Sequence, residues 1–295
     1  MNGIVTESVA NTVRQAFDFD VEKFPLTGPD GMRTPLYGLF RSDSSECVGG
    51  AVSQRYVPHT TEDVLALVEA AGEAWGGAAA VRTYFRDGHY VAVQPTVEHR
   101  KSVINSRDAV WPRLVIRAPY GGEGSFSGSV GFYRDLCSNM SMLRRVSGTT
   151  VAIRHTSGLR GQMDELITSF GQLEAGWQNL TQVMAAMQER RVRLTDFLTK
   201  LYGEPDERNG RSRTMHRNRT EAIVSRLIRE RARLGVETLS GDYIVSGWEA
   251  FNAVQGYVQH DSRRRGNPSD MARVVLAMND SHVRRAEDLV YELAL

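Results

Sequence analysis

A long apolar stripe in the middle of the chain is the strongest pattern in the sequence. From Met163 to Leu201, apolar residues recur at alternating steps of three and four. The stripe runs through Met163, Leu166, Phe170, Leu173, Trp177, Leu180, Met184, Met187, Arg191, Leu194, Leu198 and Leu201, and only Arg191 is polar. A period near 3.5 residues predicts a helix of about forty residues, roughly 60 Å long, with one apolar face.

A stripe of this length has to be covered, either by the core of the chain or by a second copy in an oligomer. Gly171 and Gly176 each weaken a helix by about 1 kcal/mol relative to alanine, and they indicate places where another backbone packs closely. Thr195 and Asp196 form a second helix start, so two helices in nearly the same register are the alternative. Either arrangement keeps the apolar face.

Before the stripe, alternating patterns predict antiparallel hairpins. Residues 81–86 and 89–94 flank Asp87-Gly88. This dipeptide favours a two-residue turn, which would place Phe85 opposite Tyr90.

A second hairpin and a fifth strand follow. Residues 113–118 and 127–133 are joined by the glycine-rich residues 120–125. We interpret the glycines as a turn, because no Gly-Lys-Ser/Thr follows them as in a phosphate-binding loop. Residues 149–154 form the fifth strand, directly before the long helix.

The N-terminal part of the chain carries weaker signals. Residues 1–50 predict a loosely structured lead-in with turns at 27–31 and 42–45. A helix is expected to begin at Thr61 and to end at Gly72.

Several helices are expected after the stripe. One covers much of residues 208–233 after a loop, a second carries core aromatic residues, and two more begin near Asp270 and Ser281. The core positions of the second helix are Trp248, Phe251, Val254 and Tyr257. The sequence therefore predicts an α+β fold in which antiparallel β-hairpins pack on a long α-helix and a helical part follows. We expect an N-terminal lead-in over 1–50, an α+β core over 51–203 and a basic helical region over 204–295.

Composition narrows the class of protein. The chain has 295 residues, 41% of them hydrophobic, and a net charge of +1. No apolar run approaches the roughly twenty residues of a membrane helix, and no signal peptide begins the chain, so we expect a cytoplasmic protein of its host cell without membrane contact. Cys47 and Cys137 are too isolated for a disulfide framework or a zinc site.

The basic residues are almost all arginine. Lysine occurs only at positions 23, 101 and 200, so 33 of the 36 basic residues are arginine. This bias has two readings, the codon usage of a GC-rich genome and the recognition of phosphate by guanidinium groups. Codon usage does not explain clustering, so the positions of the arginines along the chain carry more information.

One arginine cluster stands out. Residues 208–233 contain only Glu221 and Glu230 as acids. The arginines are Arg208, Arg211, Arg213, Arg217, Arg219, Arg226, Arg229, Arg231 and Arg233. A solvated helix face and a polyanion-binding segment are both consistent with this cluster.

We predict two sets of nucleic-acid-binding residues and no catalytic ones. Arg117, Arg134 and Arg154 lie on predicted strands, with His155 at the strand exit, and are expected to line a rigid groove. The second set, in a loop and helix start, is Arg211, Arg213, Arg217 and Arg219. The seven histidines are scattered, and the sequence has no zinc-protease motif, Walker lysine or nucleophile elbow, so we expect neither an enzyme nor a cofactor.

Several segments together resemble a large phage and plasmid protein family, domain of unknown function family 932, from about Tyr56 onward. The marks are Ala71-Gly72 with Gly76-Gly77, the glycine-turn hairpin, residues 135–139, residues 153–156 and, most specifically, the run from Trp248 to His260. Gln259 stands where the family usually has an acid, and Leu136 where it usually has valine. The resemblance implies no known chemistry.

A remoter likeness is to phage single-strand annealing proteins of the RecT and Red-beta type, which are similar in having hairpins followed by a long helix. This likeness implies a non-catalytic protein that binds and anneals single-stranded DNA in recombination, as a homo-oligomeric ring or filament. The alternative is a protein-interaction factor of a phage, active against host defence or in virion assembly. The near-neutral charge favours this alternative.

Overall fold

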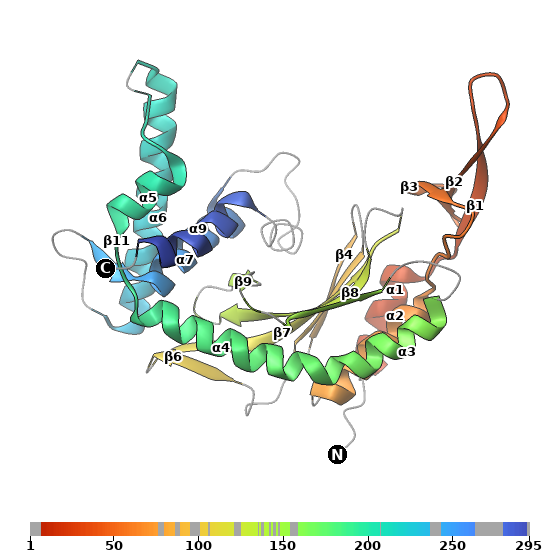
Figure 1. Cartoon of the computed structure of the whole chain (residues 1–295), viewed down its shortest axis with the longest axis horizontal. Coiled ribbons are helices and arrows are strands. Elements are labelled where there is room, and N and C mark those ends of the chain that lie inside the picture. Colours follow the sequence, from red (N-terminus) through yellow and green to blue (C-terminus); the bar gives the residue numbers. More distant parts are fainter. Residues whose placement is uncertain are drawn as a thin grey trace. The chain divides into compact units, whose positions relative to one another are not determined.

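A computed structural model gives the architecture of the protein (Figure 1). The structure describes residues 7–75, 80–85, 89–94, 101–105, 107–120, 125–134, 136, 139–141, 143, 146, 148–153, 159–206, 208–236, 243–262 and 280–293. Helices and antiparallel sheets make up these residues, which confirms the α+β class.

The chain divides into two units, each assembled from separate segments. The N-terminal unit comprises Met1–Arg100, Pro112–Gly131 and Ser147–Trp177, and the C-terminal unit comprises Lys101–Trp111, Phe132–Val146 and Gln178–Leu295. The predicted ranges 1–50, 51–203 and 204–295 were contiguous and differ from these units. Strands β7 (Asp108–Ala118) and β8 (Phe126–Arg134) contribute residues to both units, which a linear division of the sequence cannot express.

The first fifty residues are folded, contrary to the prediction of a loose lead-in. Helix α1 (Glu7–Phe17) precedes a three-stranded antiparallel sheet of β1 (Val21–Thr27), β2 (Arg33–Arg41) and β3 (Cys47–Ser53). The predicted turns at 27–31 and 42–45 are the connections of this sheet. Most of its residues are not buried, so the strands lack the strong apolar alternation by which strands are recognised.

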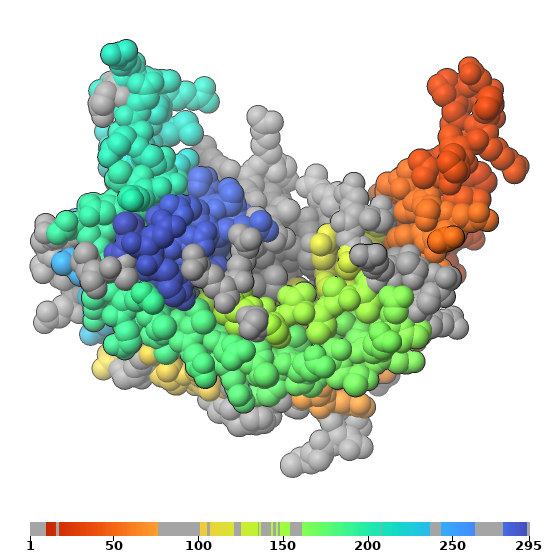
Figure 2. Space-filling model, in the orientation of Figure 1, coloured from red at the N-terminus to blue at the C-terminus, as the bar shows by residue number. Residues whose placement is uncertain are grey.

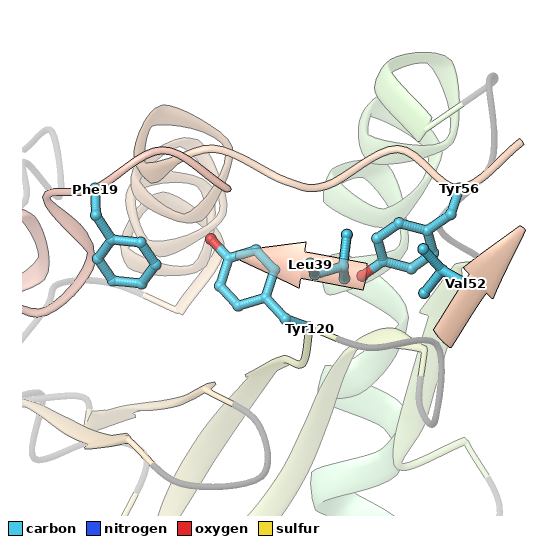
Figure 3. Close-up of a cluster of buried hydrophobic side chains, with 5 residues drawn as sticks. All are labelled: Phe19, Leu39, Val52, Tyr56 and Tyr120. Atoms are coloured by element: carbon cyan, nitrogen blue, oxygen red, sulfur yellow. The ribbon is translucent and has the colours of Figure 1, made fainter. Parts of the chain in front are cut away.

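A small core lies beneath this sheet. Figure 3 shows Leu39 and Val52 from the sheet beside Phe19, Tyr56 and Tyr120, all of them buried. Segments distant in the sequence therefore hold the first fifty residues in place.

Helix α2 (Thr61–Trp75) begins where its capping residues predicted. The Thr60 hydroxyl accepts a hydrogen bond from the Asp63 N–H at 3.2 Å, and the Asp63 carboxylate accepts one from the Thr60 N–H at 2.8 Å. The predicted end of this helix at Gly72 was wrong, because the helix continues to Trp75. Burial of Trp75, 2% exposed, outweighs the roughly 1 kcal/mol by which one glycine weakens a helix.

The main sheet confirms the predicted strands. Its order is β10-β8-β7-β5-β4, with β6 beside β7 and β9 beside β8. The strands not yet introduced are β4 (Ala80–Phe85), β5 (His89–Gln94), β6 (Ser102–Asn105), β9 (Asn139–Ser141) and β10 (Thr150–Ile153).

The register of the first hairpin differs by one residue from the prediction. Phe85 lies opposite His89, and Tyr84 lies opposite Tyr90. Three residues therefore connect the strands where the Asp-Gly dipeptide predicted two, and a shift of one residue changes every cross-strand pair.

The apolar stripe is buried as predicted. A single long helix was wrong, whereas the alternative of a further helix that starts close to Thr195 is confirmed. The stripe runs through α3 (Leu159–Ser169), a 3-10 turn η2 (Phe170–Gln172), α4 (Leu173–Glu189), β11 (Arg191–Arg193) and α5 (Leu194–Tyr202). All its apolar members are buried, so the stripe offers no surface to a second copy, which removes the reason for expecting an oligomer there. Exposed Arg191 and Arg193 flank buried Val192, and this alternation is that of a strand.

The two glycines of the stripe have different surroundings. A Cβ atom on Gly176 would lie 2.4 Å from the carbonyl oxygen of Gly148, which confirms a close backbone approach. A Cβ atom on Gly171 would meet nothing within 4 Å, so the same expectation was wrong there.

The C-terminal unit is mostly helical. It contains α6 (Gly210–Leu234), β12 (Ile244–Ser246), α7 (Gly247–Gly256), a π-helix η3 (Tyr257–Asp261) and α9 (Ser281–Glu292). Strand β12 pairs with β11. Every residue of α7 is buried, which confirms the core role of Trp248, Phe251 and Val254, whereas Tyr257 lies in η3 and is half-buried. Helix α9 begins as predicted after its cap Asp280. The helix expected near Asp270 lies outside the described residues.

Candidate nucleic-acid interface

Helix α6 has two halves with different surroundings. Its buried residues are Ile223, Leu227, Glu230 and Leu234, so burial begins only in the second half. In Figure 2 the first half, in teal, projects beyond α9, in dark blue. We call residues 208–222 the arginine arm.

Arginines of the second half serve the fold. The Arg226 guanidinium donates two hydrogen bonds to the Asp261 carboxylate, at 2.8 and 2.9 Å. Arg231 donates to Glu249 at 2.5 Å, and Arg233 donates to the carbonyl oxygen of Leu136 at 2.9 Å. Part of the arginine cluster is therefore explained by packing within the C-terminal unit.

The arginine arm is organised differently. Arg211, Arg213 and Arg217 are exposed, and Arg219 is half-buried. The four lie on regular helix, so the expected loop setting was wrong, because the Asn209 side chain already caps the helix by accepting from the N–H groups of residues 211 and 212. A helix fixes the spacing of these cations, and its N-terminal dipole adds further positive potential.

Among the described residues, the ion pair between Glu221 and Arg217 removes little of this charge. Glu221 lies 3.9 Å from Arg217, but the two side chains are 68% and 69% exposed, so solvent screens their attraction. Asp206 accepts a hydrogen bond from the backbone N–H of Arg208 at 3.0 Å, which shapes the turn before the helix.

Two neighbouring concavities border the arm. The smaller, about 250 Å³, is lined partly by Tyr202, Arg211 and Arg219, and the larger, about 530 Å³, partly by Arg213 and Arg217. Pro205 and His216 line both. Because Arg213 and Arg217 share one face of the helix and Arg211 and Arg219 lie on another, the two concavities border different sides of the arm.

Tyr202 is a member of this site that the sequence did not indicate. The Arg219 guanidinium lies over its ring at 4.4 Å from the centroid, and the His282 ring lies 4.9 Å away. Burial raises the pKa of the Tyr202 hydroxyl, an effect that Arg219 opposes. Tyr202 ends α5 and Arg219 lies on the next helix, so only their tertiary packing reveals the pair.

Arg134 does not belong to a nucleic-acid groove, contrary to its predicted role. It is 1% exposed. Its Nε atom donates to both carboxylate oxygens of Asp108, at 2.8 and 3.0 Å, and its Nη1 atom donates to Glu230. The Trp248 indole N–H completes the cluster by donating to Asp108 at 2.8 Å. Two buried carboxylates hold this guanidinium inside the unit, where a strand of DNA cannot reach it.

Of the other predicted strand-set residues, Arg117 is the one that the structure describes. Arg117 is half-buried on β7 and belongs to the N-terminal unit, whereas the arginine arm belongs to the C-terminal unit. Arg154 and His155 lie outside the described residues. The predicted groove of strand arginines is therefore contradicted at Arg134 and stays a prediction for Arg117, Arg154 and His155.

Metal binding and membrane spanning find no basis in the described part of the chain. No three His, Cys, Asp or Glu side chains among these residues are grouped to hold a metal ion. None of the helices described combines the length and apolar character needed to cross a bilayer.

A family model described as Domain of unknown function (DUF932) matches residues 48–289. The chain belongs to this family. No curated protein and no solved structure matches it. The DUF932 match covers both units, and it includes the arginine arm as well as the buried α7.

The segment that most specifically resembled DUF932 has a structural role here. Within it, Trp248 donates to Asp108, Glu249 closes a capping box with Ser246, and the Asn252 amide donates to the Trp248 carbonyl at 2.9 Å. These contacts position α7 in the core of the C-terminal unit.

Proposed function

We propose that this protein binds single-stranded DNA through the arginine arm without catalysing a reaction, and that this binding serves the annealing of complementary strands. The setting that we propose, a phage or other mobile element in the cytoplasm of its host, rests on the sequence resemblance described above. Assembly into a homo-oligomer stays a prediction for sizing measurements.

The observation that carries the proposal is the segregation of arginines along α6. In the second half of the helix, Arg226 and Arg231 form ion pairs with buried or half-buried carboxylates. In the first half, Arg211, Arg213 and Arg217 are exposed to solvent on a helix that fixes their spacing. Arg213 and Arg217, four residues apart, share one face of the helix, and Arg211 lies on the other side. Exposed guanidinium groups at such fixed positions suit the phosphates of a nucleic acid strand, and the adjoining concavities suit unstacked bases better than a rigid duplex.

Salt dependence gives the proposal a quantitative test. Each phosphate contact contributes about 0.7 to the slope of log affinity against log salt for a single strand. Replacing Arg211, Arg213 and Arg217 by glutamine should lower the slope by about 2 if each contacts one phosphate. A matched triple variant at the exposed Arg33, Arg55 and Arg229 should keep the wild-type slope.

The experiment is a salt titration of a fluorescent oligodeoxynucleotide with the three proteins, beside a strand-annealing assay. Unchanged affinity and slope in the arm variant would overturn the proposal. Binding without annealing would retain the DNA-binding part and remove the annealing part.

One observation favours the alternative of a protein-interaction factor. The hairpin formed by β1 and β2 exposes Phe24 at 49%, Met32 at 73% and Leu36 at 41%. Apolar side chains exposed close together on one hairpin are typical of protein-binding surfaces. Loss of partner capture on replacing Phe24 and Met32 by serine, with DNA binding absent in the wild type, would support this alternative.

A further inference from the structure

The one polar residue of the apolar stripe, Arg191, lines a cavity at the other end of α6. This cavity has a volume of about 450 Å³, within the usual range of small-molecule sites. Arg107 before β7, Arg191 on β11 and Arg231 on α6 converge on it, and Glu249 is the only acid among the described residues that line it. All of these residues belong to the C-terminal unit.

Two of the three arginines are held in place by the protein. Arg231 donates to Glu249 at 2.5 Å, with the two side chains only 16% and 10% exposed. Arg107 donates from Nη1 to the carbonyl oxygen of Leu234 at 2.9 Å. Gly235 makes this approach feasible, because a Cβ atom there would lie 2.2 Å from the same Nη1 atom.

The negative end of the α6 dipole is covered at this cavity. The backbone N–H of Gly235 donates to the carbonyl of Ala232 at 3.1 Å, and that of Val236 donates to the carbonyl of Arg231 at 3.0 Å. Arg107 occupies the Leu234 carbonyl. These carbonyl oxygens are therefore already bonded at the point where an anion would enter.

Arg191 is the arginine without a structural task. It is exposed on β11, and its side chain has no ion pair or hydrogen bond with any residue that the structure describes. Gln188, one helical turn earlier, accepts from the Ser246 hydroxyl through its carbonyl oxygen at 3.0 Å. The amide nitrogen of Gln188 keeps its N–H donors for another partner.

We propose that this cavity binds a phosphate monoester, with Arg191 as the residue that reaches the phosphate. The described residues of the lining, three arginines and one glutamate among them, carry a net charge of +2. Such a group carries about −1.5 to −2 at pH 7 and matches the planar fork of guanidinium groups. The apolar walls from Leu234 and Val236 accommodate the organic part of the ligand. The monoester belongs either to a free nucleotide or to the terminal phosphate of a nucleic acid strand.

Arg191→Gln is the decisive variant, because it keeps the backbone pairing of β11 and changes a side chain that has no ion pair or hydrogen bond with a described residue. Arg193→Gln is the matched control. Arg193 lies on the same strand outside the cavity lining, and its pair with Asp196 is exposed and 3.6 Å long. Without ligand, Arg191→Gln should melt within a degree or two of the wild type.

Binding is measured by calorimetry and thermal shift with adenosine monophosphate against adenosine, and with oligonucleotides that carry a terminal phosphate or a hydroxyl. We expect the phosphorylated member of at least one pair to bind at least tenfold more tightly, and Arg191→Gln but not Arg193→Gln to remove that preference. A preference confined to the mononucleotide or to the oligonucleotide identifies the source of the phosphate.

No preference in either pair, or a preference that survives Arg191→Gln, would overturn the inference. It does not depend on the proposed function, since a protein that binds no DNA can still prefer adenosine monophosphate. Conversely, the arginine-arm variant should keep the phosphate preference, and its loss there would place the anion on the arm instead.

Discussion

Replacing Arg134 by methionine should destabilise the C-terminal unit strongly and leave the chemistry of DNA binding untouched. The substitution keeps most of the side-chain volume but leaves Asp108, fully buried, and Glu230, 4% exposed, without their shared guanidinium. Removing one partner of a buried ion pair typically costs about 3–5 kcal/mol, because an uncompensated charge remains inside.

The lower end of this range applies here. Asp108 keeps the Trp248 indole N–H at 2.8 Å, and Glu230 keeps Arg226 at 3.8 Å, so neither carboxylate loses every partner. We therefore expect a loss of about 3 kcal/mol in the free energy of unfolding. With a urea slope of about 3 kcal/mol per molar, the unfolding midpoint should fall by about 1 M.

The assay is urea unfolding followed by tryptophan fluorescence, with hydrogen exchange of the α7 amides to assign the effect to the C-terminal unit. The control is Arg229→Met, which removes an exposed arginine from the same helix and should change stability by less than about 0.5 kcal/mol. Adding Asp108→Asn to the Arg134→Met variant should recover part of the loss, because it removes one of the two stranded charges.

Wild-type stability in Arg134→Met together with weakened binding to single-stranded DNA would refute this reasoning. That result would mean that Arg134 is a surface residue in contact with phosphate, as the sequence predicted. A stability loss with unchanged affinity, measured where the variant is still folded, supports the buried role.

Two other predictions concern local geometry. Gly176→Ala should destabilise the N-terminal unit in thermal unfolding, because the new Cβ atom would lie 2.4 Å from the Gly148 carbonyl oxygen. Gly171→Ala, whose Cβ atom would meet nothing within 4 Å, should be neutral or stabilising. Equal effects of the two substitutions would contradict the close approach. The hydrogen bond from Arg41 lowers the pKa of Asp43 from 3.8 to about 2, so its stabilising effect is complete above pH 3.8 and is lost as the pH falls through about 2. In Arg41→Gln, an NMR titration should show that pKa returning toward 3.8, and a value still near 2 would mean that other groups hold it.

Local patterns in the sequence were enough for much of the secondary structure. The start of α2 at Thr61 and the strands of both hairpins were predicted from capping residues and alternation. The buried positions of the apolar stripe were predicted as well, because helical periodicity reflects which side of an element meets the core. These signals depend on neighbours within a few residues.

Predictions failed where distant segments decided the outcome. The long helix is interrupted at Arg191 because residues 191–193 pair with β12, which lies more than fifty residues later in the chain. The N-terminal sheet shows little apolar alternation, and its core includes Tyr120, which follows β7 in the sequence. Nothing within the local sequence window contains these partners.

The roles of the arginines show the same division most clearly. The sequence determined that arginine is clustered in residues 208–233 and that Arg191 interrupts an apolar stripe. Only the tertiary structure decided that Arg134 is neutralised by two buried carboxylates, whereas Arg191 lines a cavity. The physical reason is that a guanidinium group has the same charge everywhere in a sequence, and its function depends on which acids, carbonyl groups and solvent the fold places around it.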